Sequence, residues 1–160
     1  MPNLTYRPLN GDDFDALHRV VSDWAVVRQL GRWPWPPEPA FTRSRCKPFD
    51  GNGFVWGVCR DSQLVGSIGV TDAEIGYMFG KDVHGAGIGT QAVRDAVAHA
   101  FAEYEWDTLK ARTWHDNPAS CAVLSKCGFQ HWQTAYEASF VRRAPTLTHY
   151  FRLPRAQWTA

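Results

Sequence analysis

The stretch from residue 84 to residue 90 places small residues directly ahead of a helical pattern. It reads His-Gly-Ala-Gly-Ile-Gly-Thr, and apolar side chains recur at helical spacing over residues 91–101. Glycines let a backbone bend sharply and approach a ligand closely. The free amides of such a loop and the positive end of the helix dipole then point at one spot, which favours a phosphate or pyrophosphate. The sequence predicts a local phosphate site here, and the alternative is an ordinary tight loop.

Two common phosphate motifs do not account for this loop. A P-loop requires Gly-Lys followed by Ser or Thr, and no glycine at the head of the predicted helix is followed by lysine. The relaxed dinucleotide fingerprint is met by Gly87, Gly89 and Ala92. That fingerprint belongs after the first strand of a parallel sheet, whereas the strands predicted before this loop are antiparallel.

A second segment with candidate polar groups begins at Asn117. Asn before Pro118 is a helix start signal, so Asn117 is expected to cap a helix that ends at Gly128. This helix carries Ser120, but no adjacent histidine is evident that would activate a nucleophile on it. The four cysteines contain no Cys-x-x-Cys pair, and His115, Cys121 and Cys127 are too widely separated for a zinc pattern. We expect reduced, mostly buried thiols and no metal site.

The elements that position these segments alternate between strand and helix. A strand at residues 4–8 precedes a helix with an apolar face over 14–24, for which Asp12 or Asp13 is the candidate cap, and the helix continues to residue 30 after a break. Three prolines make residues 31–37 a loop. The remaining predicted elements are a short helix at 38–46, strands at 54–59, 64–70, 73–79 and 109–113, a helix at 118–127, and strands at 129–137 and 146–153. Alternation on the third of these strands puts Ala73, Ile75, Tyr77 and Phe79 on one face and Glu74, Gly76 and Met78 on the other.

Length and composition fit one domain over residues 1–160. The chain has 44% hydrophobic and 21% charged residues, which suits a packed core. Its net charge of +1 gives no bulk attraction to nucleic acid or an acidic membrane. No apolar stretch approaches the roughly 20 residues of a membrane helix, and the first seven residues do not resemble a secretory signal. We therefore expect a cytoplasmic protein.

The glycine loop and the segment that follows resemble the GNAT superfamily of acetyl-coenzyme A dependent N-acetyltransferases. The family loop reads Gln or Arg, two residues, Gly, one residue, then Gly or Ala, and Gly87 and Gly89 match it. His84 occupies the first position, which is a departure. Asn117-Pro118-Ala119-Ser120, followed by Leu124-Ser125-Lys126-Cys127-Gly128-Phe129, is similar to the family's Asn-x-x-Ser helix and its ending.

The resemblance is narrower on the strand before the loop. Glu74-Ile75-Gly76-Tyr77 is similar to the Glu-Ile-Gly-Tyr strand of the branch that contains ribosomal-protein alanine N-acetyltransferases. The resemblance implies an α/β fold with a mixed, mostly antiparallel sheet of six or seven strands and helices on both faces. It also implies that acetyl-CoA, with no metal, is held by Met78, Phe79, His84, Gly85, Ala86, Gly87, Ile88, Gly89, Thr90, Asn117 and Ser120.

The family's catalytic pattern transfers only in part. An amine acceptor must lose a proton, and the resemblance places Glu74 beside the acceptor as the base, with Asp72 and Glu137 as weaker candidates. A backbone amide at Met78 or Phe79, where the family's strand bulges, is the candidate for stabilising the oxyanion. Many members carry a tyrosine acid where this chain has Leu124, so Ser120 is the substitute.

The acceptor itself has no evident motif. Trp33 and Trp35 lie in the proline-rich loop and are candidates for the wall of an acceptor pocket or for a subunit contact, which leaves a homodimer open. The expected acceptor is an amine, either a protein N-terminus or a small molecule. His115 and His149 are candidate proton carriers, but we expect them to be surface histidines or histidines with hydrogen-bond partners. The alternative function is an acetyl-CoA sensor or scaffold that has lost turnover.

Overall fold

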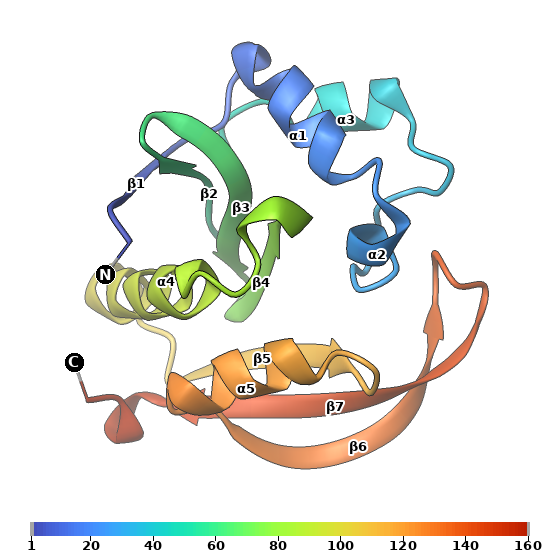
Figure 1. Cartoon of the computed structure of the whole chain (residues 1–160). Helices are drawn as coiled ribbons and strands as arrows, with labels where there is room; N and C mark the ends of the chain where they lie inside the picture. Colours follow the sequence, from blue (N-terminus) through green and yellow to red (C-terminus); the bar gives the residue numbers. More distant parts are fainter. Residues whose placement is uncertain (1, 160) are drawn as a thin grey trace.

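The computed structural model describes residues 2–159, which form a seven-stranded sheet in the order β1-β2-β3-β4-β5-β7-β6 (Figure 1). All neighbouring strands are antiparallel except β4 and β5, which are parallel. The predicted mixed, mostly antiparallel α/β fold is therefore confirmed. The strands are β1 (Leu4–Arg7), β2 (Gly53–Arg60), β3 (Gln63–Thr71), β4 (Glu74–Phe79), β5 (Thr108–Trp114), β6 (Gln130–Ser139) and β7 (Ala144–Pro154).

Five α-helices cover the two faces of this sheet in the described chain. The buried side chains of α4 pack with Ile75 and Phe79 of β4 in the larger apolar cluster, which α5 joins through Leu124. Met78, on the opposite face of β4, packs with the apolar side chains of α1 and α2 in a second cluster. The helices are α1 (Phe14–Val20), α2 (Trp24–Val27), α3 (Pro39–Arg45), α4 (Ile88–Glu103) and α5 (Pro118–Lys126), and short 3₁₀ turns lie at Gly11–Asp13, Lys81–Val83 and Arg155–Gln157.

The helix starts differ from the sequence expectation at two places. Asn10, rather than Asp12 or Asp13, caps the first turn: its side chain accepts a hydrogen bond from the Asp12 amide. Asp13 is instead held by Arg7 and by the amide of Asn10, so it anchors β1 to the helix. Helix α4 begins at Ile88 and not near residue 91, because the glycine loop turns directly into its first turn.

Tight turns bring β4 into place beside β3. Asp61 and Ser62 between β2 and β3 both have positive φ angles, as do Asp72 and Ala73 between β3 and β4. Positive φ at both central residues is the geometry of the two-residue turns that match the twist of a hairpin. Ala73 is therefore a turn residue, and the strand that carries the candidate site residues begins at Glu74.

The sheet is nearly divided between β4 and β5. One registered pair, Glu74 with Lys110, joins the two strands, and the Lys110 amide donates to the Ala73 carbonyl at 2.8 Å. Toward their carboxyl ends the strands diverge, whereas β3 stays paired with β4 from Thr71–Glu74 to Gly66–Phe79. The divergence leaves one edge of β4 unpaired and opens a gap through the sheet.

In the described part of the chain, none of the helices has the length and apolar character needed to cross a bilayer.

Candidate active site

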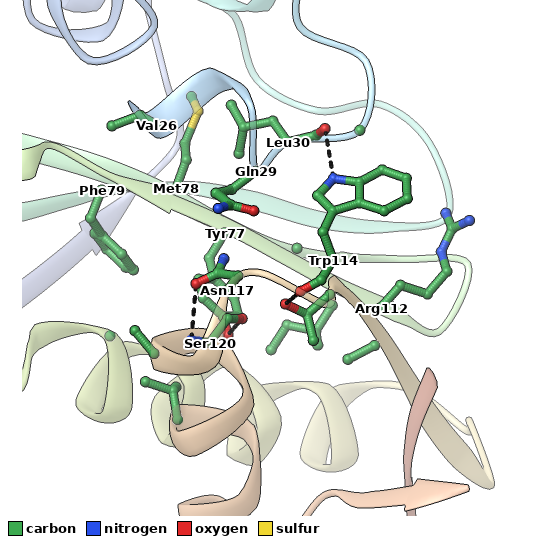
Figure 2. Close-up of a pocket in the computed structure, with 18 of the residues that line it drawn as sticks. Val26, Gln29, Leu30, Tyr77, Met78, Phe79, Arg112, Trp114, Asn117 and Ser120 are labelled. Carbon is green, nitrogen blue, oxygen red and sulfur yellow. Dashed lines mark hydrogen bonds between the residues drawn. The ribbon is translucent and has the colours of Figure 1, made fainter. Parts of the chain in front are cut away.

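A cavity of about 1260 Å³ follows the gap between β4 and β5 and reaches both faces of the sheet (Figure 2). On the α4 and α5 side it is lined by the glycine loop and by Asn117, Ser120 and Val123. On the opposite side it is lined by residues of α2, the loop after it and the β6–β7 turn. The cavity therefore runs from the helix termini on one face of the sheet to the far face.

The glycine loop, residues 84–90, presents backbone donors at the start of α4. Gly85 and Gly87 have φ angles of 81° and 76°, a left-handed conformation that residues other than glycine adopt at a cost. The amides of residues 85–90 donate to no other group of the described chain, so they remain available at the positive end of a 16-residue helix. Backbone donors arranged in this way can bind an anion, and the phosphate site stays a prediction.

Most of the predicted loop residues line the cavity, and the His84 side chain hydrogen-bonds to the end of β4. His84, Gly85, Gly87, Ile88, Gly89 and Thr90 are on its wall, whereas Ala86 is not. His84 Nε2 lies 3.0 Å from the Phe79 carbonyl oxygen, so it must carry the proton that it donates. The side chain thus ties the loop to the end of β4, and Lys126 adds a cation to the same wall.

The unpaired edge of β4 supplies further backbone donors. The Ala73 carbonyl bonds to β5 and the Gly80 amide bonds to Val65 of β3. Since backbone groups point to alternate sides along a strand, the amides of Tyr77 and Phe79 face the gap, and the Met78 amide faces β3. Of the two expected oxyanion donors, only the Phe79 amide is therefore directed at the cavity.

The expected bulge in this strand is not seen. The pairing of β3 with β4 runs through Met78 and Phe79 without a register shift, and the irregularity in this part of the sheet falls at Val58 and Cys59 instead. The divergence of β5 from β4 exposes the Phe79 amide, so no bulge is needed to free it.

Three polar side chains meet where α5 approaches β4. The Asn117 side chain accepts a hydrogen bond from the Ser120 amide at 3.3 Å, so it caps the helix as the sequence predicts. Ser120 Oγ lies 2.6 Å from the Tyr77 hydroxyl, and all three residues line the cavity (Figure 2). Burial is the main cause that raises the pKa of Tyr77 to about 12. Leu124, one turn along α5, is fully buried and presents no polar group.

A cluster of charged side chains occupies the other face of the sheet. Glu74 Oε1 accepts a hydrogen bond from Arg112 Nε at 2.6 Å, and Arg112 Nη1 lies 3.2 Å from Glu137 Oε2. Tyr150, opposite Arg112 on β7, donates its hydroxyl to Glu137. Burial and then this hydrogen bond raise the pKa of Tyr150 to about 12. We call these four residues the carboxylate cluster; two carboxylates and one guanidinium leave it with one net negative charge.

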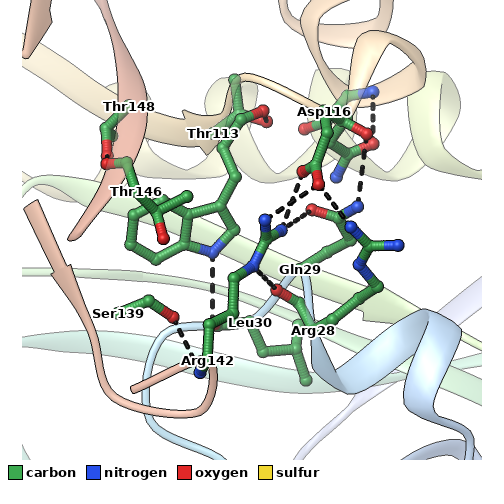
Figure 3. A network of polar contacts seen from close by, with 12 residues as sticks. Arg28, Gln29, Leu30, Thr113, Asp116, Ser139, Arg142, Thr146 and Thr148 are labelled. Carbon is green, nitrogen blue, oxygen red and sulfur yellow. Dashed lines mark hydrogen bonds and ion pairs between the residues drawn. The ribbon is translucent and has the colours of Figure 1, made fainter. Parts of the chain in front are cut away.

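An ion-pair network lies beside the cavity, which Gln29 of the network lines (Figure 3). Arg142, in the β6–β7 turn, makes two hydrogen bonds of 2.8 Å to the Asp116 carboxylate and donates to the Arg28 carbonyl at 2.9 Å and to Gln29 Oε1 at 3.0 Å. Arg28 also pairs with Asp116. Hydrogen bonding to Arg142 is the main cause that lowers the pKa of Asp116 to about 2. This arginine clamp (Arg28, Gln29, Asp116 and Arg142) joins the end of α2 to the β6–β7 turn, beside the Trp114–Leu30 hydrogen bond.

The two candidate acceptor tryptophans are placed elsewhere. Among the described residues, neither Trp33 nor Trp35 lines the cavity. Trp33 packs edge-on against Phe41, Trp35 packs against Trp24, and both contact the second apolar cluster. Apolar neighbours from α2 and α3 give their rings a core to join despite the prolines, and Phe41 and Arg32 line the cavity instead.

Other candidates lie away from the cavity. Asp72 is exposed in the β3–β4 turn, where it accepts a hydrogen bond from Asn52. His149 contacts Thr134, and His115 is exposed. Among residues 2–159, no group of three or more His, Cys, Asp or Glu side chains could hold a metal ion.

Sequence reasoning missed the partners that organise the site. Tyr77 was expected to be a face residue of a strand, but the structure brings it to Ser120 across 43 positions of sequence. The partners of Glu74 and Asp116 are also distant in the chain, at 38 and 26 positions, and surface arginines carry no local signal of such pairing. Only the alternation on β4, which puts Glu74 and Tyr77 on opposite faces, pointed to a site with two sides.

Comparisons with known proteins agree over most of the chain. The family model described as "Acetyltransferase (GNAT) domain" matches residues 3–130. The chain is 30% identical over 173 residues to "Putative ribosomal N-acetyltransferase YdaF" of Bacillus subtilis (strain 168), with 98% of this chain and 93% of that protein covered. Two solved structures share the fold at low identity and both contain CoA. The spermidine N-acetyltransferase from Vibrio cholerae in complex with CoA and spermine has a TM-score of 0.78, 15% identity and 96% coverage of each chain. RimL, a ribosomal L7/L12 alpha-N-protein acetyltransferase in complex with CoA, has a TM-score of 0.79, 18% identity and coverage of 94% of this chain and 93% of its own.

Proposed function

This chain belongs to the GNAT acetyltransferase family, and we propose that it moves the acetyl group of acetyl-CoA directly onto the nitrogen of a primary amine. The observation that carries the proposal is the cavity through the β4–β5 gap. Backbone donors for a diphosphate lie at one end of it, and a carboxylate base lies at the other. Both reactants can then be bound at once on opposite faces of the sheet, as a direct transfer requires.

The residues at the helix termini fit a thioester carrier with a diphosphate. The amides of residues 85–90 and the dipole of α4 would hold the diphosphate, as helix N-termini hold anions generally. Lys126 would add a positive charge beside it. Asn117 and the unpaired edge of β4 would hold the amide-containing arm that leads to the thioester. Bound there, acetyl-CoA supplies an activated acetyl group with a good leaving group.

Glu74 is proposed to take the proton from the acceptor, directly or through water. An aliphatic ammonium has a reference pKa of about 10.4, so the acceptor must lose a proton before it can attack. Glu74 Oε1 is occupied by Arg112, while Oε2 accepts no hydrogen bond from the described chain. Arg112 therefore fixes the carboxylate and leaves one oxygen for the acceptor.

The transfer step then forms one bond and breaks one. The amine nitrogen uses its lone pair to form the C–N bond, and the oxyanion that develops accepts a hydrogen bond from the Phe79 amide. The C–S bond breaks with its electron pair on sulfur, where the thiolate accepts a hydrogen bond from Ser120. The second nitrogen proton passes to water, or to Glu74 after Glu74 has released the first proton to water, and the thiolate takes a proton from water after it leaves.

The acceptor class is proposed as a primary amine because the Glu74 and Glu137 carboxylates can accept hydrogen bonds from an ammonium on this side of the cavity, which Arg32, Arg45 and Arg112 also line. The relatives point to different amines: one is named for ribosomal acetylation, and another is solved with spermine. A protein N-terminus and a small-molecule amine therefore both belong in the first screen.

The test is a free-thiol release assay with acetyl-CoA and a panel of amines, which includes peptides with free N-termini and polyamines. For the best acceptor, Glu74→Gln should lower kcat by about 100-fold or more, the range of a lost general base, and should leave the Kd for acetyl-CoA unchanged. Glu103→Gln, an exposed residue outside the cavity, is the matched control. Tight acetyl-CoA binding with no turnover of any amine would instead favour a sensor or scaffold.

A further inference from the structure

The Tyr77 hydroxyl is a buried polar group of the cavity that the transfer step above does not use. It projects from β4 toward the first turn of α5 and lies 2.6 Å from Ser120 Oγ (Figure 2). We propose that Tyr77 is a positioning residue for Ser120: the phenol donates to Ser120 Oγ, so that the single Ser120 proton points at the sulfur of the departing thiolate. The inference rests on the proposed function, because it assumes that the thioester reaches Ser120.

The direction of this hydrogen bond follows from the chemistry of the two hydroxyls. A phenol is a more acidic donor than an aliphatic hydroxyl, and a buried phenol O–H needs an acceptor. The pKa of Tyr77, raised to about 12 mainly by burial, keeps its proton in place throughout the neutral range. Since Ser120 accepts from Tyr77, its own proton is left for a third group. A hydroxyl that accepts one hydrogen bond is also polarised into a stronger donor.

The backbone holds Ser120 in the geometry that this requires. Its amide donates to the Asn117 side chain at the N-cap of α5, which helps to hold the first turn of the helix beside the gap. Cys121 and Cys127 are the titratable groups that influence Tyr77 electrostatically, and burial raises the pKa of both thiols. The pair therefore faces neutral neighbours, and the Ser120 hydroxyl can donate its proton to an anion.

The pair acts by hydrogen bonding and not by giving up a proton. A thiol has a reference pKa of about 8.5, well below that of Tyr77. Passing the Tyr77 proton through Ser120 to sulfur would exchange a thiolate for the more basic phenolate. The electron pair of the broken C–S bond thus stays on sulfur, and the hydrogen bond from Ser120 stabilises it there until the thiolate leaves and is protonated by water.

The first test needs no acceptor. CoA bound to the protein is titrated by the ultraviolet absorbance of its thiolate. The wild-type protein should lower the thiol pKa of bound CoA, and Tyr77→Phe and Ser120→Ala should each raise it again by about half a unit to one unit, the size of one hydrogen bond. The double variant should match Ser120→Ala alone, because Tyr77 acts only through Ser120.

The second test is a double-mutant cycle on turnover. Ser120→Ala should lower kcat by about tenfold or more, and Tyr77→Phe by about three- to tenfold, with KM for acetyl-CoA nearly unchanged. Combining them should cost no more than Ser120→Ala alone. Tyr104→Phe removes a part-buried hydroxyl bonded to the Gly53 carbonyl at 2.9 Å outside the cavity, and it should leave kcat unchanged.

The outcomes separate this inference from the proposed function. A wild-type protein that binds no CoA contradicts both. CoA that binds with the same thiol pKa in wild type and Tyr77→Phe contradicts the inference alone, as do multiplicative losses of kcat in the double variant. Loss of activity in Tyr77→Phe with a matching loss of thermal stability and an unchanged thiol pKa would mean that Tyr77 only packs.

Discussion

The glycine loop at one end of the cavity is built from backbone amides, whereas the carboxylate cluster and the arginine clamp at the other end are built from long side chains. The loop needs only the φ angles of Gly85 and Gly87 and the start of a helix. The clamp needs residues from α2, the β5–α5 connection and the β6–β7 turn to meet. The backbone site is therefore formed by consecutive residues, whereas the side-chain site forms only when the fold brings distant residues together.

The strongest way to break the backbone end is to remove its left-handed conformation. Gly87→Val places a β-branched residue at a φ of 76°, where strain of about 2–3 kcal/mol should weaken acetyl-CoA binding by roughly 30- to 150-fold. A Cβ at this position would meet nothing within 4 Å, so lost space is not the cause. Isothermal titration calorimetry measures the change in Kd.

Gly87→Asn is the matched control, because Asn tolerates the left-handed region better than valine. It should retain most of the affinity. Equal losses for the two variants would contradict the argument from conformation.

The arginine clamp should contribute to the free energy of unfolding in a pH-dependent way. The pKa of Asp116 falls from 3.8 to about 2 because Arg142 holds the charged form. A lowered pKa stabilises the fold above pH ~4 and loses that stabilisation as the pH falls toward 2, and a shift of this size, screened by solvent at this part-exposed carboxylate, corresponds to about 1–2 kcal/mol. Asp116→Asn should therefore lower the free energy of unfolding by about that amount at pH 7, and the difference from wild type should shrink with acidification.

Urea unfolding between pH 7 and pH 3 measures this difference. Asp50→Asn, at an exposed position, should leave the pH dependence as it is in the wild type. A difference that stays constant with pH would show that the carboxylate charge is not what the clamp stabilises.

The carboxylate cluster should affect the acceptor and spare the cofactor. Arg112→Met removes the group that fixes Glu74, so kcat/KM for the amine should fall by about tenfold, the cost of one or two charged hydrogen bonds. The Kd for acetyl-CoA should not change, since the cluster lies on the other face of the sheet. Steady-state kinetics with the exposed Arg19→Met as control tests this, and a weaker acetyl-CoA affinity would argue against two separate ends.

His84 provides the smallest expected effect. Its side chain bonds to the Phe79 carbonyl and leaves the loop amides to face the ligand. His84→Gln keeps a donor, so the Kd for acetyl-CoA should change by less than about threefold. A tenfold loss would mean that the imidazole itself contacts the cofactor.

The same contrast explains what the sequence could predict. The order of strands and helices and the mostly antiparallel sheet follow from local periodicity and turn residues, as does the glycine loop ahead of a helix. The sequence predicts Trp33 and Trp35 at an acceptor pocket or a subunit contact, whereas their rings pack against apolar side chains of two helices. No local pattern indicates this packing. The Tyr77–Ser120 and Arg142–Asp116 contacts join residues 43 and 26 positions apart, and such pairs depend on how the strands diverge.

The junction between β4 and β5 rests on the single registered pair of Glu74 and Lys110. Few ladder hydrogen bonds cross that seam, so separating the halves of the sheet there disrupts much less structure than separating β2 from β3. Amide protons along the seam should accordingly exchange with solvent through a partial opening, at a lower free energy than global unfolding. Such a partial opening would allow CoA and the acetylated product to leave the cavity while both halves of the sheet stay folded.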